Sequence, residues 1–227
     1  MSRRLLLLAT GGTIAGQASD PTRLNDYTAG VMAGDQLLAA VPQLQNLATI
    51  SVEQVANVDS AELLFEHWRA LVARIRAVFA ADAELTGVVI THGTNTLEET
   101  AWLLELLIDD LRPVVLVGAM RPATALSADG PLNLFQAVQV ALSREARCHG
   151  VLVVMDGQIH AAQRVTKVAT QGVSAFASPS SGPFGWVDDV GVHLPMASGS
   201  RRVPFAALAL PEQWPQVPIV YGCVEPD

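Results

Sequence analysis

Short apolar runs alternate with helical patterns along most of the chain. Apolar or mixed runs typical of strands cover residues 4–9, 48–58, 87–91, 113–117 and 150–155. Between them, apolar side chains recur every three or four positions over 31–40, 60–79, 97–108 and 129–147, which predicts helices. Because wholly apolar strands are covered on both faces, this order predicts an α/β fold with a mostly parallel, Rossmann-like sheet flanked by helices.

Local signals mark several element boundaries. Ser60 is expected to cap the long helix that follows it, and Asp129 is expected to cap a helix with Pro131 in its first turn. Pro42 stops the helix before it, and Asp156-Gly157 predicts a hairpin after the strand at 150–155.

The amino-acid composition of the chain changes near residue 177. We therefore expect an N-terminal domain over residues 1–176 and a Ser-, Gly- and Pro-rich linker with short strand-like pieces over 177–217. Residues 218–227 are expected to form the first strand of an incomplete second α/β domain.

Composition narrows the classes of function. Of the 227 residues, 50% are hydrophobic, so the chain can bury a core. Its net charge of -8 argues against a nucleic-acid partner. No apolar stretch approaches the roughly 20 residues of a membrane span, and the apolar start at 5–9 is too short for a signal peptide. Two distant cysteines, Cys148 and Cys223, fit a reducing, cytoplasmic location.

Two glycine turns carry the candidate chemistry. One, Thr10-Gly11-Gly12-Thr13-Ile14-Ala15-Gly16, follows the first strand, and the other, Thr91-His92-Gly93-Thr94-Asn95-Thr96, follows the strand at 87–91. Ligands bind outside the carboxyl ends of strands in open α/β sheets, so two threonines there suggest a nucleophile facing a partner across one crevice.

Each of these residues also has an ordinary structural interpretation. Thr13 and Thr94 are suited to helix caps, Tyr27 to a surface loop, and Lys167 to a solvated surface. The alternative is that Tyr27 closes over the crevice and that a desolvated Lys167 acts as a base. The glycine spacing is neither a dinucleotide fingerprint nor a P-loop, and the histidines and cysteines show no metal-ligand spacing.

Taken together, the motifs resemble the N-terminal domain of bacterial-type L-asparaginases and their glutaminase-asparaginase relatives. The two glycine turns look like the two family signatures, and two further segments also match: Val117-Gly118-Ala119-Met120-Arg121-Pro122 and Ser127-Ala128-Asp129-Gly130-Pro131-Leu132-Asn133-Leu134.

The resemblance implies a threonine amidohydrolase that needs no cofactor or metal. L-asparagine, or glutamine, would lose its side-chain amide as ammonia through an acyl-enzyme in a homo-oligomer. Thr13 matches the nucleophile, Tyr27 the lid tyrosine that serves it, and Thr94 with Lys167 the pair that activates the attacking group or water. The expected substrate-binding residues are Gly12, Asp59, Ser60, Ala61, Gly93, Asn95 and Ala119; among them, Ser60 matches the serine that holds the substrate carboxylate and Ala119 a residue lining the amide end.

The chain departs from the family pattern at three points. Asn95 stands where the family usually has an acid that binds the substrate ammonium, and Ala61 stands where glutamine is common. The family site is also completed by a neighbouring subunit's second domain, including a glutamate that no position here matches. Two alternatives therefore stay open: a non-catalytic domain that binds a small amino acid, and an amidase or amidotransferase-type subunit whose substrate lacks a free ammonium.

Overall fold

A computed structural model describes residues 3–195, 205 and 207–219. Over these residues the chain forms an eight-stranded sheet and a separate two-stranded sheet. The spatial order of the main sheet is β10 (Val192–His193), β9 (Gly185–Val187), β6 (Gln158–Ala161), β5 (Val151–Met155), β4 (Val114–Val117), β3 (Leu85–Thr91), β1 (Arg4–Gly11) and β2 (Thr49–Val58). The small sheet pairs β7 (Thr166–Lys167) with β8 (Phe176–Ala177).

The main sheet is parallel from β2 to β5 and antiparallel beyond β5, which confirms the predicted mostly parallel α/β fold. The hairpin predicted at Asp156-Gly157 joins β5 to β6. Asp156 has φ 50° and Gly157 has φ 73°, the positive values that a two-residue type I′ turn requires at both central positions. Because β1 to β5 are parallel, their carboxyl ends all lie at the same end of the sheet.

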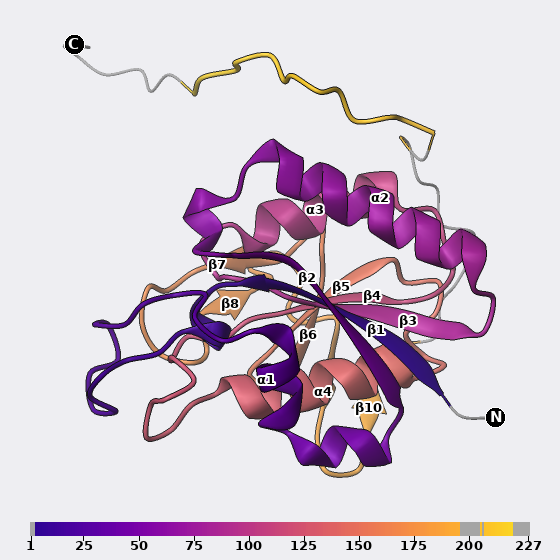
Figure 1. Cartoon of the computed structure of the whole chain (residues 1–227). Helices are drawn as coiled ribbons and strands as arrows, with labels where there is room; N and C mark the ends of the chain where they lie inside the picture. Colours follow the sequence, from indigo (N-terminus) through magenta and orange to yellow (C-terminus); the bar gives the residue numbers. More distant parts are fainter. Residues whose placement is uncertain (1–2, 196–204, 206, 220–227) are drawn as a thin grey trace.

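Helices cover both faces of this sheet (Figure 1). α2 (Phe65–Ala81) and α3 (Leu97–Leu107) lie on one face, and α1 (Gly34–Ala39) and α4 (Gly130–Leu142) lie on the other. Three short 3₁₀ turns complete the described elements: η1 (Thr13–Ala15), η2 (Pro42–Asn46) and η3 (Ser60–Glu62).

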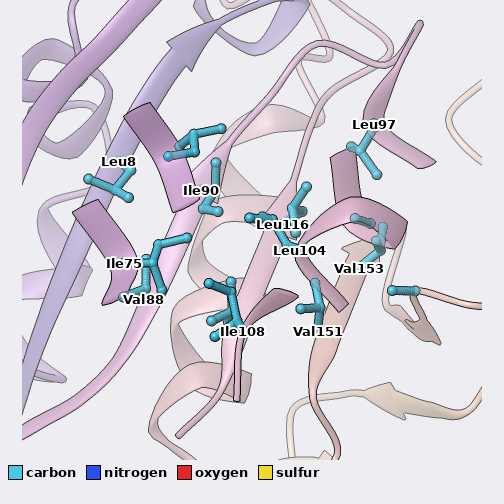
Figure 2. Close-up of a cluster of buried hydrophobic side chains, with 14 of the residues drawn as sticks. Leu8, Ile75, Val88, Ile90, Leu97, Leu104, Ile108, Leu116, Val151 and Val153 are labelled. Carbon is cyan, nitrogen blue, oxygen red and sulfur yellow. The ribbon is translucent and has the colours of Figure 1, made fainter. Parts of the chain in front are cut away.

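Alternate strand residues build two separate cores. Leu6 and Leu8 of β1 point to α2 and α3, whereas Leu5 and Leu7 point to α1 and α4. Figure 2 shows the first of these cores, where strand side chains such as Ile90 and Leu116 meet helix side chains such as Leu104. Burial on both faces is the reason that the central strands carry no polar alternation.

Two predicted helix boundaries were wrong. Ser60 does not cap the long helix, because Ser60–Glu62 form η3, in which Asp59 accepts a hydrogen bond from the Ala61 N–H, and α2 begins only at Phe65. α4 ends at Leu142, because Ser143 is extended and its hydroxyl accepts from the Ala146 N–H. α4 does start after Asp129 with Pro131 in its first turn, as predicted, but the Asp129 side chain forms no cap hydrogen bond and binds other backbone groups, described below.

The segment after residue 177 is partly built into the sheet. β9 and β10 fall among the expected strand-like pieces of the linker; β9 pairs with β6 and β10 pairs with β9. Of the strand expected at 218–227, only Pro218 and Ile219 are described, and neither is in a strand; the rest lies outside the described residues. The domain boundaries stay predictions. No helix in the described ranges has the length and apolar character needed to cross a membrane.

Candidate active site

The strand order places a crevice beside β1. The chain passes from β1 to β2 on one side and later to β3 on the other, so the direction of winding reverses between β1 and β3. Such a switch point separates the loops that leave the two carboxyl ends and opens a binding crevice there. The Thr10 hydroxyl donates to the Thr91 carbonyl at 2.9 Å and joins the two strand ends beneath it.

The first turn depends on glycine. Gly11 and Gly12 have φ values of 99° and 79°, which favour glycine. A Cβ on Gly12 would also overlap the backbone of Gly93, so the turns after β1 and β3 are in direct contact. The threonine after each of these glycines, Thr13 and Thr94, is 6% exposed.

Tyr27 closes on Thr13. Their hydroxyl oxygens are 2.7 Å apart, and either one can be the donor. The loop that carries Tyr27 is held by paired backbone hydrogen bonds between Gln17 and Thr28, each 2.9 Å. The tyrosine ring lies so close to Gly16 that a Cβ there would be 2.8 Å from its Cδ2. Thr13 therefore has a phenol within reach of its hydroxyl proton.

Lys167 is hydrogen-bonded to the Thr94 hydroxyl, as Tyr27 is to the Thr13 hydroxyl. Its Nζ donates to Thr94 Oγ1 at 2.9 Å and to Asn95 Oδ1 at 3.3 Å. Burial lowers the pKa of Lys167, and the carboxylates of Asp59 and Glu98 act in the opposite direction. The Glu98 carboxylate also accepts hydrogen bonds from the Lys167 backbone N–H and the Thr166 hydroxyl, which fixes β7 against the start of α3.

Lys167 carries a compositional signal that motif reading missed. It is the one lysine in the chain, whereas the other 13 basic residues are all arginine. Arginine does not lose its proton in proteins, but a desolvated lysine does. Among the lysine and arginine side chains of this protein, only Lys167 can therefore become neutral.

Ser60, Asp59 and Asn95 form a connected group opposite Lys167. The buried Ser60 hydroxyl accepts from the Asn95 and Thr96 N–H groups, at 3.1 and 3.3 Å. Asn95 Nδ2 donates to Asp59 Oδ1 at 3.0 Å. Asn95 thus connects the lysine to a carboxylate. An open depression lies beside this group, lined by Asn95, Lys167 and residues 168–171.

The structure brings together most of the expected site residues. Gly12, Thr13, Tyr27, Asp59, Ser60, Gly93, Thr94, Asn95 and Lys167 are linked by the contacts above. Ala61 is exposed and contributes its backbone N–H to Asp59. Ala119 follows β4 and is wholly buried, so its methyl group does not face an open surface.

Two polar residues of the segment 127–134, Asp129 and Asn133, bind backbone groups next to the site. The Asp129 carboxylate accepts from the Met120 and Arg121 N–H groups at 2.9 Å each. Asn133 donates to the Gly118 carbonyl at 3.1 Å and accepts from the Asp156 N–H. They hold the loop after β4, a role that the capping pattern did not reveal. Among the described residues, no three His, Cys, Asp or Glu side chains gather as a metal site.

Comparison with known proteins shows the family to which the chain is similar. The family model described as "Asparaginase, N-terminal" matches residues 4–198. The chain is 41% identical over 217 residues to L-asparaginase 2 of Bacillus subtilis, covering 95% of this chain and 58% of that protein. It is 44% identical over 183 residues to a glutaminase-asparaginase of Pseudomonas fluorescens, covering 81% of this chain and 50% of that one.

A solved structure shares the fold. The probable cytoplasmic L-asparaginase from Campylobacter jejuni has a TM-score of 0.85 and 43% identity, covering 92% of this chain and 64% of that one. The chain spans between half and about three fifths of the length of the curated relatives named here. With a family model matched across most of its length and these structural and sequence similarities, this chain belongs to the asparaginase N-terminal family.

Proposed function

We propose that this chain is the catalytic domain of an asparaginase-type amidohydrolase. Its substrate would be L-asparagine, with glutamine as a second substrate, and its products the side-chain acid and ammonia. The observation that carries the proposal is the pair of activated hydroxyls, Thr13 with Tyr27 and Thr94 with Lys167, on turns that touch at the switch point. The relatives' names, L-asparaginase and glutaminase-asparaginase, support the same chemistry.

Thr13 is the nucleophile in this proposal. Its oxygen attacks the amide carbon as its proton passes to the Tyr27 hydroxyl, 2.7 Å away, and Tyr27 in turn gives its own hydroxyl proton to the amide nitrogen. Collapse of the tetrahedral intermediate breaks the C–N bond, and the nitrogen, which has taken up that proton, leaves as ammonia. An acyl-enzyme ester on Thr13 remains.

Thr94 and Lys167 handle the second half of the reaction. We assign Thr94 the role of taking a proton from the attacking group or water, while it passes its own hydroxyl proton to the Nζ of Lys167, 2.9 Å away, when that amine is neutral. Burial moves Lys167 toward the neutral form in which it accepts a proton. Water then adds to the ester, and Thr13 is released with its proton restored.

Ser60 is positioned to hold the substrate carboxylate. Two backbone N–H groups occupy the acceptor side of its hydroxyl, so the hydroxyl proton is available to donate. Asn95, in contrast, offers no charge to an ammonium group, which favours a second candidate: an amidase whose substrate has no free ammonium. Comparing asparagine with N-acetyl-asparagine distinguishes the two candidates, because only an ammonium-dependent site prefers free asparagine.

The protein's location and assembly belong to the same proposal. We assign it to the cytoplasm as a homo-oligomer, in line with the solved neighbour described as probable cytoplasmic. A relative from Haemophilus influenzae is described as periplasmic, so fractionation of the native cell decides the location.

Thr13→Val tests the proposal directly. The substitution keeps the branched shape and removes the hydroxyl, so ammonia release should fall by roughly three orders of magnitude or more. Thr86→Val is the matched control, since Thr86 lies near the opposite end of β3 and should leave the rate unchanged. Ammonia release by a folded Thr13→Val protein at the parental rate would exclude Thr13 as the nucleophile.

A further inference from the structure

A chain of buried hydrogen bonds lies under the turn that carries Thr94. Trp68 Nε1 of α2 is 2.8 Å from Thr100 Oγ1 of α3, and Thr100 Oγ1 is 2.9 Å from His92 Nε2. His92 Nδ1 is 2.7 Å from the Gly93 carbonyl oxygen. His92 and Thr100 are both fully buried. The chain therefore runs from the partly buried Trp68 of the helix layer to the catalytic turn, and its two inner members are closed to solvent.

The direction of every bond in this chain is determined by its two ends. A carbonyl oxygen only accepts, so the ring proton of His92 is on Nδ1. An indole N–H only donates, so Thr100 accepts from Trp68 and gives its own proton to His92 Nε2. The imidazole is thus a neutral ring with both nitrogens satisfied, and burial lowers the pKa of His92 to about 4, which keeps it neutral at pH 7.

The bond to Gly93 controls the orientation of a reactive segment. The Gly93 carbonyl and the Thr94 N–H belong to one planar trans peptide, so holding the carbonyl on the buried side directs the N–H away from it. Glycine by itself would let this peptide rotate easily. The backbone of Gly93 also lies against Gly12 and Ser60, so a rotation here would disturb both neighbouring parts of the site.

We propose that His92 is a positioning residue: through Thr100 and Trp68 it holds the Gly93 carbonyl, and so places the Thr94 peptide and hydroxyl against Lys167. The catalytic value of this placement rests on the proposed function. The placement itself does not, and it is open to measurement without any turnover.

Nuclear magnetic resonance on the full chain tests the placement. The His92 ring should be neutral at pH 7 with its proton on Nδ1. The residual dipolar coupling of the Thr94 N–H reports the orientation of the peptide. It should change in Thr100→Val, which removes the hydroxyl, and return in Thr100→Ser, which restores it. Trp68→Phe, which keeps the Thr100–His92 bond, should have a smaller effect than Thr100→Val.

Kinetics add a second readout wherever the chain releases ammonia. Thr100→Val should lower kcat about tenfold with little change in KM, the factor equivalent to roughly 1.4 kcal/mol of lost hydrogen-bond energy. Thr100→Ser should recover most of the rate. A His92 proton on Nε2, or an unchanged Thr94 coupling in folded Thr100→Val, would overturn the inference whether or not the protein is active. If the Thr94 couplings are as expected but the protein releases no ammonia, the result would count against the proposed function alone.

Discussion

At the scale of single residues, Lys167 shows how burial prepares a side chain for chemistry. Its Nζ is 2.9 Å from Thr94 Oγ1, and desolvation lowers its pKa against the opposing fields of Asp59 and Glu98. A lowered pKa means that the neutral amine, the form that accepts a proton, becomes populated at a lower pH than in an exposed lysine.

The pH dependence of ammonia release should follow this amine. We predict that the rate rises with pH as Lys167 loses its proton, with a midpoint below the ordinary lysine value of 10.5. Lys167→Met should remove this limb and lower kcat by about 10²–10⁴-fold. Because the chain has one lysine, its Nζ resonance can be titrated without ambiguity. A resonance that titrates at or above the ordinary value would contradict the assigned role.

Asn95 decides how the site treats an ammonium group. A hydrogen bond to a charged group contributes roughly 1.5–3 kcal/mol, so an acid at this position should raise kcat/KM for asparagine by about one to two orders of magnitude. Here, however, Asn95 Nδ2 donates to Asp59 Oδ1, and two carboxylates at that distance repel.

We therefore predict that Asn95→Asp alone gives less than the full gain, and that Asp59→Asn combined with Asn95→Asp gives more. Steady-state kinetics with asparagine and N-acetyl-asparagine measure both variants. If the double variant gains nothing with asparagine, the natural substrate has no ammonium at this point.

At the scale of elements, a single arginine, Arg112, binds the carbonyl groups at the C-terminal end of α2. Arg112 donates to the carbonyl oxygens of Phe79 and Asp82 at 2.7 Å each, and its guanidinium lies 4.1 Å from the centre of the Phe79 ring. It also pairs with Asp110 and is only 11% exposed. These contacts satisfy carbonyls that a helix end leaves without partners, and they attach the loop before β4 to the helix layer.

Arg112→Ala should lower the free energy of unfolding by about 2–4 kcal/mol, because it leaves helix-end carbonyls and a partly buried carboxylate without their partner. Arg23→Ala is the matched control: its pair with Asp26 is largely exposed and should be worth less than about 1 kcal/mol. Urea titration measures both. Equal losses for the two variants would show that Arg112 does not hold the end of α2.

At the scale of the whole molecule, the chain corresponds to only part of its relatives. It covers 58% of the Bacillus subtilis protein, and exposed apolar side chains lie at Leu64 just before α2, at Phe65 in α2 and at Trp102 in α3. Apolar surface of this kind favours association when nothing covers it.

We predict that the 227-residue chain alone self-associates and releases ammonia slowly, and that joining it to a family-type second domain restores a defined oligomer and activity. Light scattering with an ammonia assay measures both properties. A monodisperse monomer that hydrolyses asparagine efficiently would show that this domain is self-sufficient.

Much of the fold was determined by local sequence. The apolar strands, the helix periodicity and the Asp156-Gly157 turn depend on neighbouring residues, so a linear reading predicts them. The glycine turns were found in the same way, because only glycine suits Gly11 and Gly12. Caps were predicted less well: α4 starts after Asp129 as expected, but α2 does not start at Ser60, and tertiary contacts engage both side chains elsewhere.

What only the tertiary structure decided is which side chains meet. Lys167 and Thr94 are 73 positions apart, and Trp68 and Thr100 are 32 apart, so no local pattern encodes their hydrogen bonds. Here the resemblance to a family supplied the Lys167–Thr94 pair, but nothing in the sequence indicated the buried chain to His92. The physical reason is that burial and the choice of hydrogen-bond partner are properties of packed elements, whereas turn chemistry and periodicity are properties of the chain itself.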